Sequence, residues 1–214
     1  VEVRWQIIAT DPDGLLLVPL MNGVIREEIH ANDKNWLPRV QETIALPPQI
    51  PPGIAKLKLV ANDEHGKTTA EREVEFKIGG KPLPKVPVFS LLDLAFYESD
   101  TAMSPMREAV YRPGGALWAR FQMAGFQLGP KNRFEVTYGL EIRSPDGKIL
   151  YQRPEAASDA AEPFYPRRVL NGGVTLDITP GVAPGEYVLV IKAQDKVGSG
   201  QAEASARFRV AAKE

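Results

Sequence analysis

The sequence contains no cysteine and only two histidines, His30 and His65. Without cysteine the chain can form no disulfide, no thiolate nucleophile and no cysteine-ligated zinc site. A catalytic triad or a histidine-based metal site requires partner residues at recognisable spacing, and neither histidine has them. We therefore predict that the protein is not an enzyme, that it carries no cofactor, and that both histidines lie in surface loops.

Long apolar runs and a strong excess of one charge are also missing. The longest apolar stretch, Leu15 to Met21, contains Pro19 and is far shorter than the roughly 20 residues that a membrane span needs. The 26 basic and 27 acidic side chains almost cancel, so no broad positive field would attract nucleic acid or anionic lipid. We therefore expect no nucleic-acid partner and no membrane insertion.

An internal repeat is the strongest feature that the sequence does contain. Residues 52–66 align with residues 184–198 at a constant offset of 132, and no gap is needed. Upstream, two Pro-Asp-Gly tripeptides, at residues 12–14 and 145–147, align at an offset of 133. One inserted residue reconciles the two offsets, so we infer that the chain consists of two diverged copies of one unit.

The repeat also predicts the domain organisation. It pairs residues 3–78 with 136–210 and leaves 89–135 without a counterpart, so the second copy is complete and the first is short. Three prolines and two glycines between Gly79 and Pro87 favour an extended connector. The predicted domains are a short unit at residues 1–80 that lacks counterparts of the first two strands, a proline-rich linker at 81–87 and a complete unit at 88–214.

Two-residue alternation predicts strands that place one face on a core. Apolar and polar residues alternate over 73–78 and 203–210, which is the period of a half-buried strand. Over 186–193 the same period places Tyr187, Leu189, Ile191 and Ala193 on one face, while Val188 and Val190 indicate that the other face is not fully solvated. Further apolar strands are expected at Phe89–Tyr97 and Ala116–Phe126. Several strands at short spacing, with proline and glycine in most gaps, indicate an all-β fold of two tandem β-sandwich domains, of which the first is shorter.

Aspartate and glycine predict the turns between these strands. In each Pro-Asp-Gly tripeptide, proline presets a type I turn and glycine accepts the left-handed conformation that follows. Asp11 and Asp13 resemble the opening of a calcium loop, but Ser144 replaces Asp11 in the second copy and no later acidic residue completes a ligand set. We therefore predict capped turns and no calcium site, and a short helical turn around Ser104 to Val110. The residues assigned to turns and to a structural corner are Asp13, Gly14, Asp63, Gly66, Asp146, Gly147, Tyr187, Asp195 and Gly198.

One of the repeated segments carries a resemblance. Its pattern, Pro-Gly-x-Tyr-x-Leu-x-Ile-x-Ala-x-Asp-x-x-Gly from Pro184 to Gly198, resembles the penultimate-strand signature of bacterial immunoglobulin-like and fibronectin type III-like modules. The resemblance implies immunoglobulin-like β-sandwiches in a protein that is secreted, periplasmic or on the bacterial cell surface. It also implies a tyrosine corner at Tyr187, whose hydroxyl would tie the preceding crossover to the sandwich. Ala55 replaces this tyrosine in the first unit.

The segment from Glu162 to Arg168 is the best candidate for an interaction surface. It combines aromatic and arginine side chains, the composition of binding hot spots. The alternative is that one aromatic side chain covers the edge of its own sandwich while the arginines pair with Glu155 or Glu162. The candidate surface residues are Phe164, Tyr165, Arg167 and Arg168, with Trp36 near the equivalent place in the first unit.

These observations favour a non-catalytic structural or protein-interaction module of a bacterial secreted or envelope protein. The alternative is a carbohydrate-binding accessory module of a larger secreted protein, for which Trp36, Phe164 or Tyr165 would have to lie exposed on a flat face. We expect a protein partner, either the rest of a longer chain or an envelope protein, with carbohydrate as the alternative. Because uncovered apolar surface costs about 25 cal/mol per Å², we also expect Val1 to lie inside a longer protein, or another segment to cover the short unit.

Overall fold

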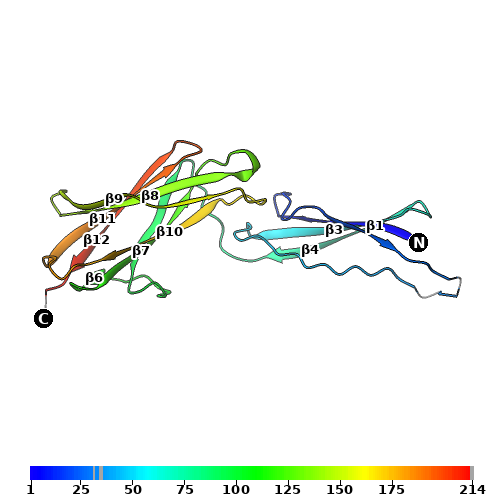
Figure 1. The fold of residues 1–214 in the computed structure, drawn as a ribbon, viewed down its shortest axis with the longest axis horizontal. Coiled ribbons are helices and arrows are strands. Elements are labelled where there is room, and N and C mark those ends of the chain that lie inside the picture. Colours follow the sequence, from blue (N-terminus) through cyan, green and yellow to red (C-terminus); the bar gives the residue numbers. More distant parts are fainter. Residues whose placement is uncertain (31, 34–35, 213–214) are drawn as a thin grey trace. The chain divides into compact units, whose positions relative to one another are not determined.

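The computed structural model describes residues 1–30, 32–33 and 36–212. Its regular structure consists almost entirely of antiparallel β-sheets, which confirms the predicted all-β class. The chain forms two compact units, Val1–Leu83 and Pro84–Glu214, and Figure 1 labels most of their strands. Within the described residues, no helix is long and apolar enough to cross a membrane.

The first unit is a four-stranded antiparallel sheet. Its strands lie in the order β2 (Met21–Arg26), β1 (Glu2–Thr10), β3 (Gly53–Asp63) and β4 (Thr68–Ile78). A short hairpin turn joins β3 to β4, because the residues around 63–68 supply the turn chemistry that the sequence indicates. The described part of residues 27–52, which joins β2 to β3, forms no strand.

The two faces of this sheet differ in chemistry. Because successive side chains of a strand point to opposite faces, the strand register determines which residues share a face. On one face almost all of them are apolar. We call it the unit-1 apolar face, and it consists of Val3, Trp5, Ile7, Ala9, Met21, Gly23, Ile25, Gly53, Ala55, Leu57, Leu59, Ala61, Ala70, Val74, Phe76 and Ile78, together with Asp63, Thr68 and Arg72.

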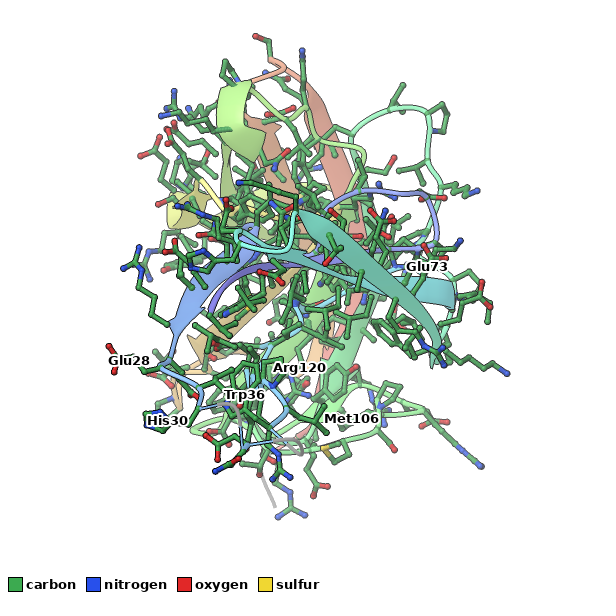
Figure 2. The ribbon with its side chains drawn as sticks, turned by 90° about the vertical axis from the view of Figure 1, so that its right-hand side faces the viewer. Glu28, His30, Trp36, Glu73, Met106 and Arg120 are labelled. Atoms are coloured by element: carbon green, nitrogen blue, oxygen red, sulfur yellow. The ribbon has the colours of Figure 1, made fainter. Side chains whose placement is uncertain are left out.

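The opposite face is mostly polar and carries cross-strand ion pairs. Lys56 Nζ on β3 lies 2.8 Å from a carboxylate oxygen of Glu73 on β4. The hydrogen bond and the charge of this lysine lower the pKa of Glu73. Exposed pairs of this kind are screened by water and contribute little to stability. In Figure 2, Glu73 lies on the other side of the unit from Glu28, His30 and Trp36, which belong to the segment after β2.

The second unit consists of two sheets. The three-stranded sheet has the order β10 (Val169–Asp177), β7 (Ala116–Ala124), β5 (Ser90–Tyr97). The five-stranded sheet has the order β6 (Val110–Tyr111), β12 (Gln201–Val210), β11 (Gly185–Asp195), β8 (Phe134–Arg143), β9 (Ile149–Ala161). All pairs are antiparallel except that of β6 with β12.

The core of the second unit lies between these two sheets. Alternate side chains of β7 are buried, and the predicted inward faces of 186–193 and 203–210 agree with the burial of Leu189, Ile191 and Phe208. Aromatic rings from different strands meet in this core at angles that suit their quadrupoles. The largest fully buried side chains of the unit are Phe134, Leu117, Met123, Leu189, Ile191, Val136, Val190 and Val210.

The prediction of a helical turn around Ser104–Val110 is wrong, because the chain bends there without a helix. Hydrogen bonds to the neighbouring strands fix its path instead. Arg120 on β7 donates from its guanidinium to the carbonyl of Ala102 at 2.8 Å, and the Met106 N–H donates to the carbonyl of Phe96 at 2.8 Å. Figure 2 labels Arg120, which lies on β7, and Met106, which lies in the connection between β5 and β6.

A half-buried ion cluster stabilises the outer face of the five-stranded sheet. The Glu141 side chain on β8 accepts hydrogen bonds from Lys192 on β11 and from Arg143, whose Nε lies 2.9 Å away. These two cations lower the pKa of the Glu141 carboxyl below its ordinary value of 4.5. Val190 lies directly beside Glu141 in the register and is buried, so the cluster also shields apolar surface.

We predict that Glu141→Gln lowers the free energy of unfolding of the second unit by about 1–2 kcal/mol at neutral pH, because charge-assisted hydrogen bonds are lost. The folded-state pKa of Glu141 is lowered, so its contribution is present above pH 4.5 and is lost as the pH falls through that lowered pKa. Urea unfolding at a series of pH values measures both effects. The matched control is Glu186→Gln, at an exposed glutamate of β11; equal effects of the two substitutions would contradict this account.

Candidate functional site

The predicted interaction segment does not form one exposed surface. Phe164 keeps 50% of its surface exposed, whereas Tyr165 is only 4% exposed and packs inside the unit. The Asn132 side-chain amide donates to the carbonyl of Phe164 at 2.6 Å, which ties the segment to the 3₁₀ turn at Pro130–Asn132. The aromatic pair is therefore divided: the Tyr165 ring is buried, and the Phe164 ring is half exposed.

The remaining candidate side chains also make contacts within their own units. The Arg167 guanidinium lies over the ring of the buried Phe134, with 5.8 Å between its Cζ and the ring centroid. Arg168 has an electrostatic or hydrogen-bonding partner as well. Trp36 belongs to the first unit, where its indole N–H donates to the Glu27 carboxylate. The structure thus brings Phe164, Tyr165 and Arg167 into one segment and leaves Trp36 in the other unit.

The first predicted turn is capped by a carboxylate. Oδ1 of Asp11 accepts hydrogen bonds from the backbone N–H groups of Asp13 at 2.9 Å and Leu15 at 2.8 Å. Gly14 has φ +85° and Gly147, in the second copy of the tripeptide, has φ +90°. A left-handed conformation of this kind favours glycine. In such a turn, the side-chain oxygen of the aspartate accepts hydrogen bonds from backbone N–H groups of the turn itself.

Asp63 and Asp195 have the same role in the two units. Asp63 accepts a hydrogen bond from the His65 N–H at 3.0 Å, and backbone donors at Gly66 and His65 lower its pKa. Asp195 is buried and accepts from the N–H groups of Val197 at 2.9 Å and Gln127 at 2.7 Å. Each carboxylate thus caps the hairpin in which it lies.

Glycine is required three residues after each of these aspartates. A Cβ atom at Gly66 would lie 2.5 Å from Oδ2 of Asp63, and a Cβ atom at Gly198 would lie 2.5 Å from Oδ2 of Asp195. Any side chain would therefore push the capping carboxylate out of place. His65 and His30 both lie exposed in loops. The part of the chain that the structure describes contains no cluster of three or more His, Cys, Asp or Glu side chains that could hold a metal ion.

Tyr187 connects the entry of β11 to the segment before it. Its hydroxyl donates to the carbonyl of Ala183 at 2.7 Å, and its ring stacks on Phe208 with 5.6 Å between the ring centroids. The hydrogen bond is the contact that a tyrosine corner makes, between a hydroxyl and the backbone a few residues upstream. Ala55 occupies the equivalent position of the first unit and is buried.

Sequence reasoning missed an apolar groove beside Tyr187. Its cavity has a volume of about 400 Å³ and lies between the start of β9, the end of β10 and the connection from β10 to β11. Leu150 and Tyr151 on β9 form one wall, and Leu176, Ile178 and Val182 form the other. The signal that could have indicated it is the run Ile149-Leu150-Tyr151, three large apolar residues in a row where an alternating strand would have polar ones.

The rim of this groove is polar on one side. Asp177 ends β10 and is exposed, and the exposed Thr179 follows it. Together with the Tyr187 hydroxyl they give the groove a few oxygen atoms above an apolar floor. This combination of apolar walls and a small number of polar groups is typical of small-molecule sites, whose volumes begin at about 300 Å³.

Comparisons with known proteins do not assign a family. No family model matches the chain, and no curated protein matches it. Among solved structures, it is similar to the Pseudomonas fluorescens alkylpurine DNA glycosylase AlkC bound to DNA containing an abasic site analog. The sequence identity is 13%, the match covers 58% of this chain and 30% of that chain, and the TM-score is 0.37. A likeness of this size gives neither DNA binding nor glycosylase activity to the chain.

The comparison nevertheless corrects two predictions. The sequence predicted a structural or protein-interaction module of a bacterial secreted or envelope protein, or a carbohydrate-binding module, and excluded nucleic acid as a partner. The similar structure is instead an enzyme bound to DNA, so the predicted function and the predicted partners are withdrawn. The predicted location stays a prediction.

We predict that Tyr165→Ala lowers the free energy of unfolding of the second unit by about 3 kcal/mol, because truncating a buried aromatic residue leaves a cavity. The neighbouring substitution Phe164→Ala is the matched control, and it should change stability by less than about 0.5 kcal/mol because that ring is exposed. Thermal and urea unfolding of both variants measures the difference. Equal destabilisation by the two substitutions would show that the placement of these rings is wrong.

Proposed function

We propose that the second unit is a complete immunoglobulin-like β-sandwich that binds a small apolar molecule in the groove between β9 and β10. We further propose that the first unit is a diverged, shorter copy of it, with the boundaries predicted from the sequence at 1–80 and 88–214. The groove beside Tyr187, with its volume of about 400 Å³, is the observation that carries the functional proposal.

The strand order of the second unit supports the immunoglobulin-like proposal. Its small sheet has the order β5-β7-β10, and the large sheet contains β12-β11-β8. In immunoglobulin domains, strands A, B and E form one sheet and strands C, F and G the other. The tyrosine-corner hydrogen bond of Tyr187 near the start of β11 fits the same scheme, because β11 would be strand F.

The strand registers support the proposal of two copies. Gly53 lies opposite Ile78 in the first unit, and Gly185 lies opposite Val210 in the second, so both positions shift by 132 residues. The strand order β2-β1-β3-β4 corresponds to β9-β8-β11-β12. A change of register by one residue would exchange the two faces of a strand. Because the two strand pairs have the same register, corresponding residues of the two units face the same side of their sheets.

The chemistry of the groove lining supports binding rather than catalysis. The residues that line it supply one carboxylate, Asp177, and no histidine, lysine or arginine. A general acid–base reaction needs a positioned donor or acceptor of suitable pKa near the reacting atom. Apolar walls with oxygen atoms at the rim suit a ligand with an aliphatic or aromatic body and one hydrogen-bond donor group, which Asp177 or Thr179 would accept.

We predict that the neutral apolar probe N-phenyl-1-naphthylamine binds this groove saturably, and that Leu150→Ser weakens its affinity about fivefold. The expected loss of roughly 1 kcal/mol corresponds to part of the burial energy of a leucine side chain. Fluorescence titration measures the dissociation constant. Because Leu150 is 50% exposed, its substitution should leave the fold intact.

The matched control is Ile149→Ser, since Ile149 is 46% exposed and does not line the groove. Its dissociation constant should stay within about twofold of the wild-type value, a difference of less than about 0.5 kcal/mol. Probe bound to the apolar surface of the first unit would not respond to either substitution. Absence of saturable binding, or equal affinity of the two variants, would reject the proposed ligand site.

A further inference from the structure

We propose that the unit-1 apolar face packs against the same face of a second copy of the chain, so that two such sheets form one layered homodimer. This inference concerns the first unit and is independent of the groove in the second. The proposal starts from the exposure of this face. Leu59 and Val74, on the neighbouring strands β3 and β4, are large apolar residues that both remain exposed.

The segment that joins β2 to β3 does not close this face. Most of its described residues are exposed, including Leu37, Val40 and Leu46. The fully buried apolar residues of the described first unit are Ala9, Leu17 and Ala55, and two of these are alanines. The large apolar residues Trp5, Leu57 and Phe76 of the face are only partly covered, and an apolar surface that is left partly open in this way marks an interaction site.

The second unit shows what an equivalent face requires. Strands β8, β11 and β12 present the corresponding inward positions, and there Val136, Leu140, Leu189 and Ile191 are buried. They pack against the three-stranded sheet formed by β5, β7 and β10. The described part of the first unit has no second sheet. A second copy would supply one, because two sheets pack face to face about 10 Å apart.

The size of the face suits a dimer. Four strands spaced about 4.8 Å apart form a sheet roughly 19 Å wide, and the nine residues of β1 at about 3.3 Å each make it about 30 Å long. Pairing two such faces would bury on the order of 1,100 Å² in total, which lies close to the lower limit of specific interfaces, about 1,200 Å². We therefore expect a dissociation constant in the micromolar range.

The charges on the face suit a second copy in particular. The only charged side chains that the register places on it are Asp63 and Arg72, one of each sign. A two-fold axis brings each position of one copy to the corresponding positions of the other, so an arginine of one copy can approach an aspartate of its partner. Packing the face against itself therefore brings no net charge into the interface.

The relief of the face is also compatible with packing against itself. Trp5 lies over Gly23, where a Cβ atom would be 2.5 Å from the ring carbon Cζ2. On the neighbouring strand β3, the small Ala61 lies beside Trp5. The larger side chains of Leu57 and Val74 lie further along β3 and β4. In the proposed dimer, large side chains of one sheet would lie opposite small ones of the other, as close packing requires.

Analytical ultracentrifugation of the full chain tests the proposal with a matched pair of substitutions. Val74→Lys introduces a charge on the unit-1 apolar face, and Val24→Lys introduces the same charge on the opposite face; these valines are 51% and 41% exposed. We expect the wild-type chain and Val24→Lys to form dimers at about 100 µM, and Val74→Lys to raise the dissociation constant at least about tenfold.

A cross-link locates the interface, since the chain has no cysteine of its own. Ala61→Cys on the apolar face should form an intermolecular disulfide on oxidation, and Asn62→Cys, the next residue on the opposite face, should not. A wild-type chain that is monomeric at about 100 µM would overturn the proposal and leave another part of this chain or an unlike protein to cover the face. Dimers that cross-link equally at both positions would overturn it as well.

Discussion

An alternating strand gives every β-sheet one apolar face, and that face is stable in water only beneath a second layer. In the second unit the layer is the three-stranded sheet, and inward residues such as Phe134 and Leu189 are fully buried beneath it. The first unit has the same order of four strands with no second sheet in the described residues. The exposed apolar residues of β3 and β4 follow directly from this difference.

The groove arises from the same geometry at the edge of the two-layered unit. Where β9 and β10 no longer cover one another, apolar side chains of both sheets stay accessible and leave a cavity of about 400 Å³. Tyr187 bounds this cavity, and its hydroxyl is held by the carbonyl of Ala183. A residue that stabilises the corner of the unit thus also lines an apolar depression, so in the proposed function one side chain serves both stability and ligand binding.

Local sequence patterns predicted what depends on local physics. Strict alternation from 203 to 210 indicates a strand with one buried face, and Asp195 followed by Gly198 indicates a capped turn; both patterns consist of residues close together in the sequence. The bend at 104–110 could not be predicted, because the Met106 N–H bonds to Phe96 on β5, and Arg120 on β7 holds the residues just before the bend. The difference in exposure between Phe164 and Tyr165 depends on how their loop, whose sequence has no periodicity, packs against the rest of the unit. The groove depends on the separation of β9 and β10, which follow one another in the sequence but belong to different sheets.

The central claim is that the two sheets are equivalent and differ in what covers them. Hydrogen–deuterium exchange of the amides in β3 and β11, measured at low and at high protein concentration, tests it most directly, since protection reports local opening. The account predicts strong, concentration-independent protection in β11, and protection in β3 that increases with concentration as its apolar face becomes covered. Equal and concentration-independent protection in both strands would contradict it.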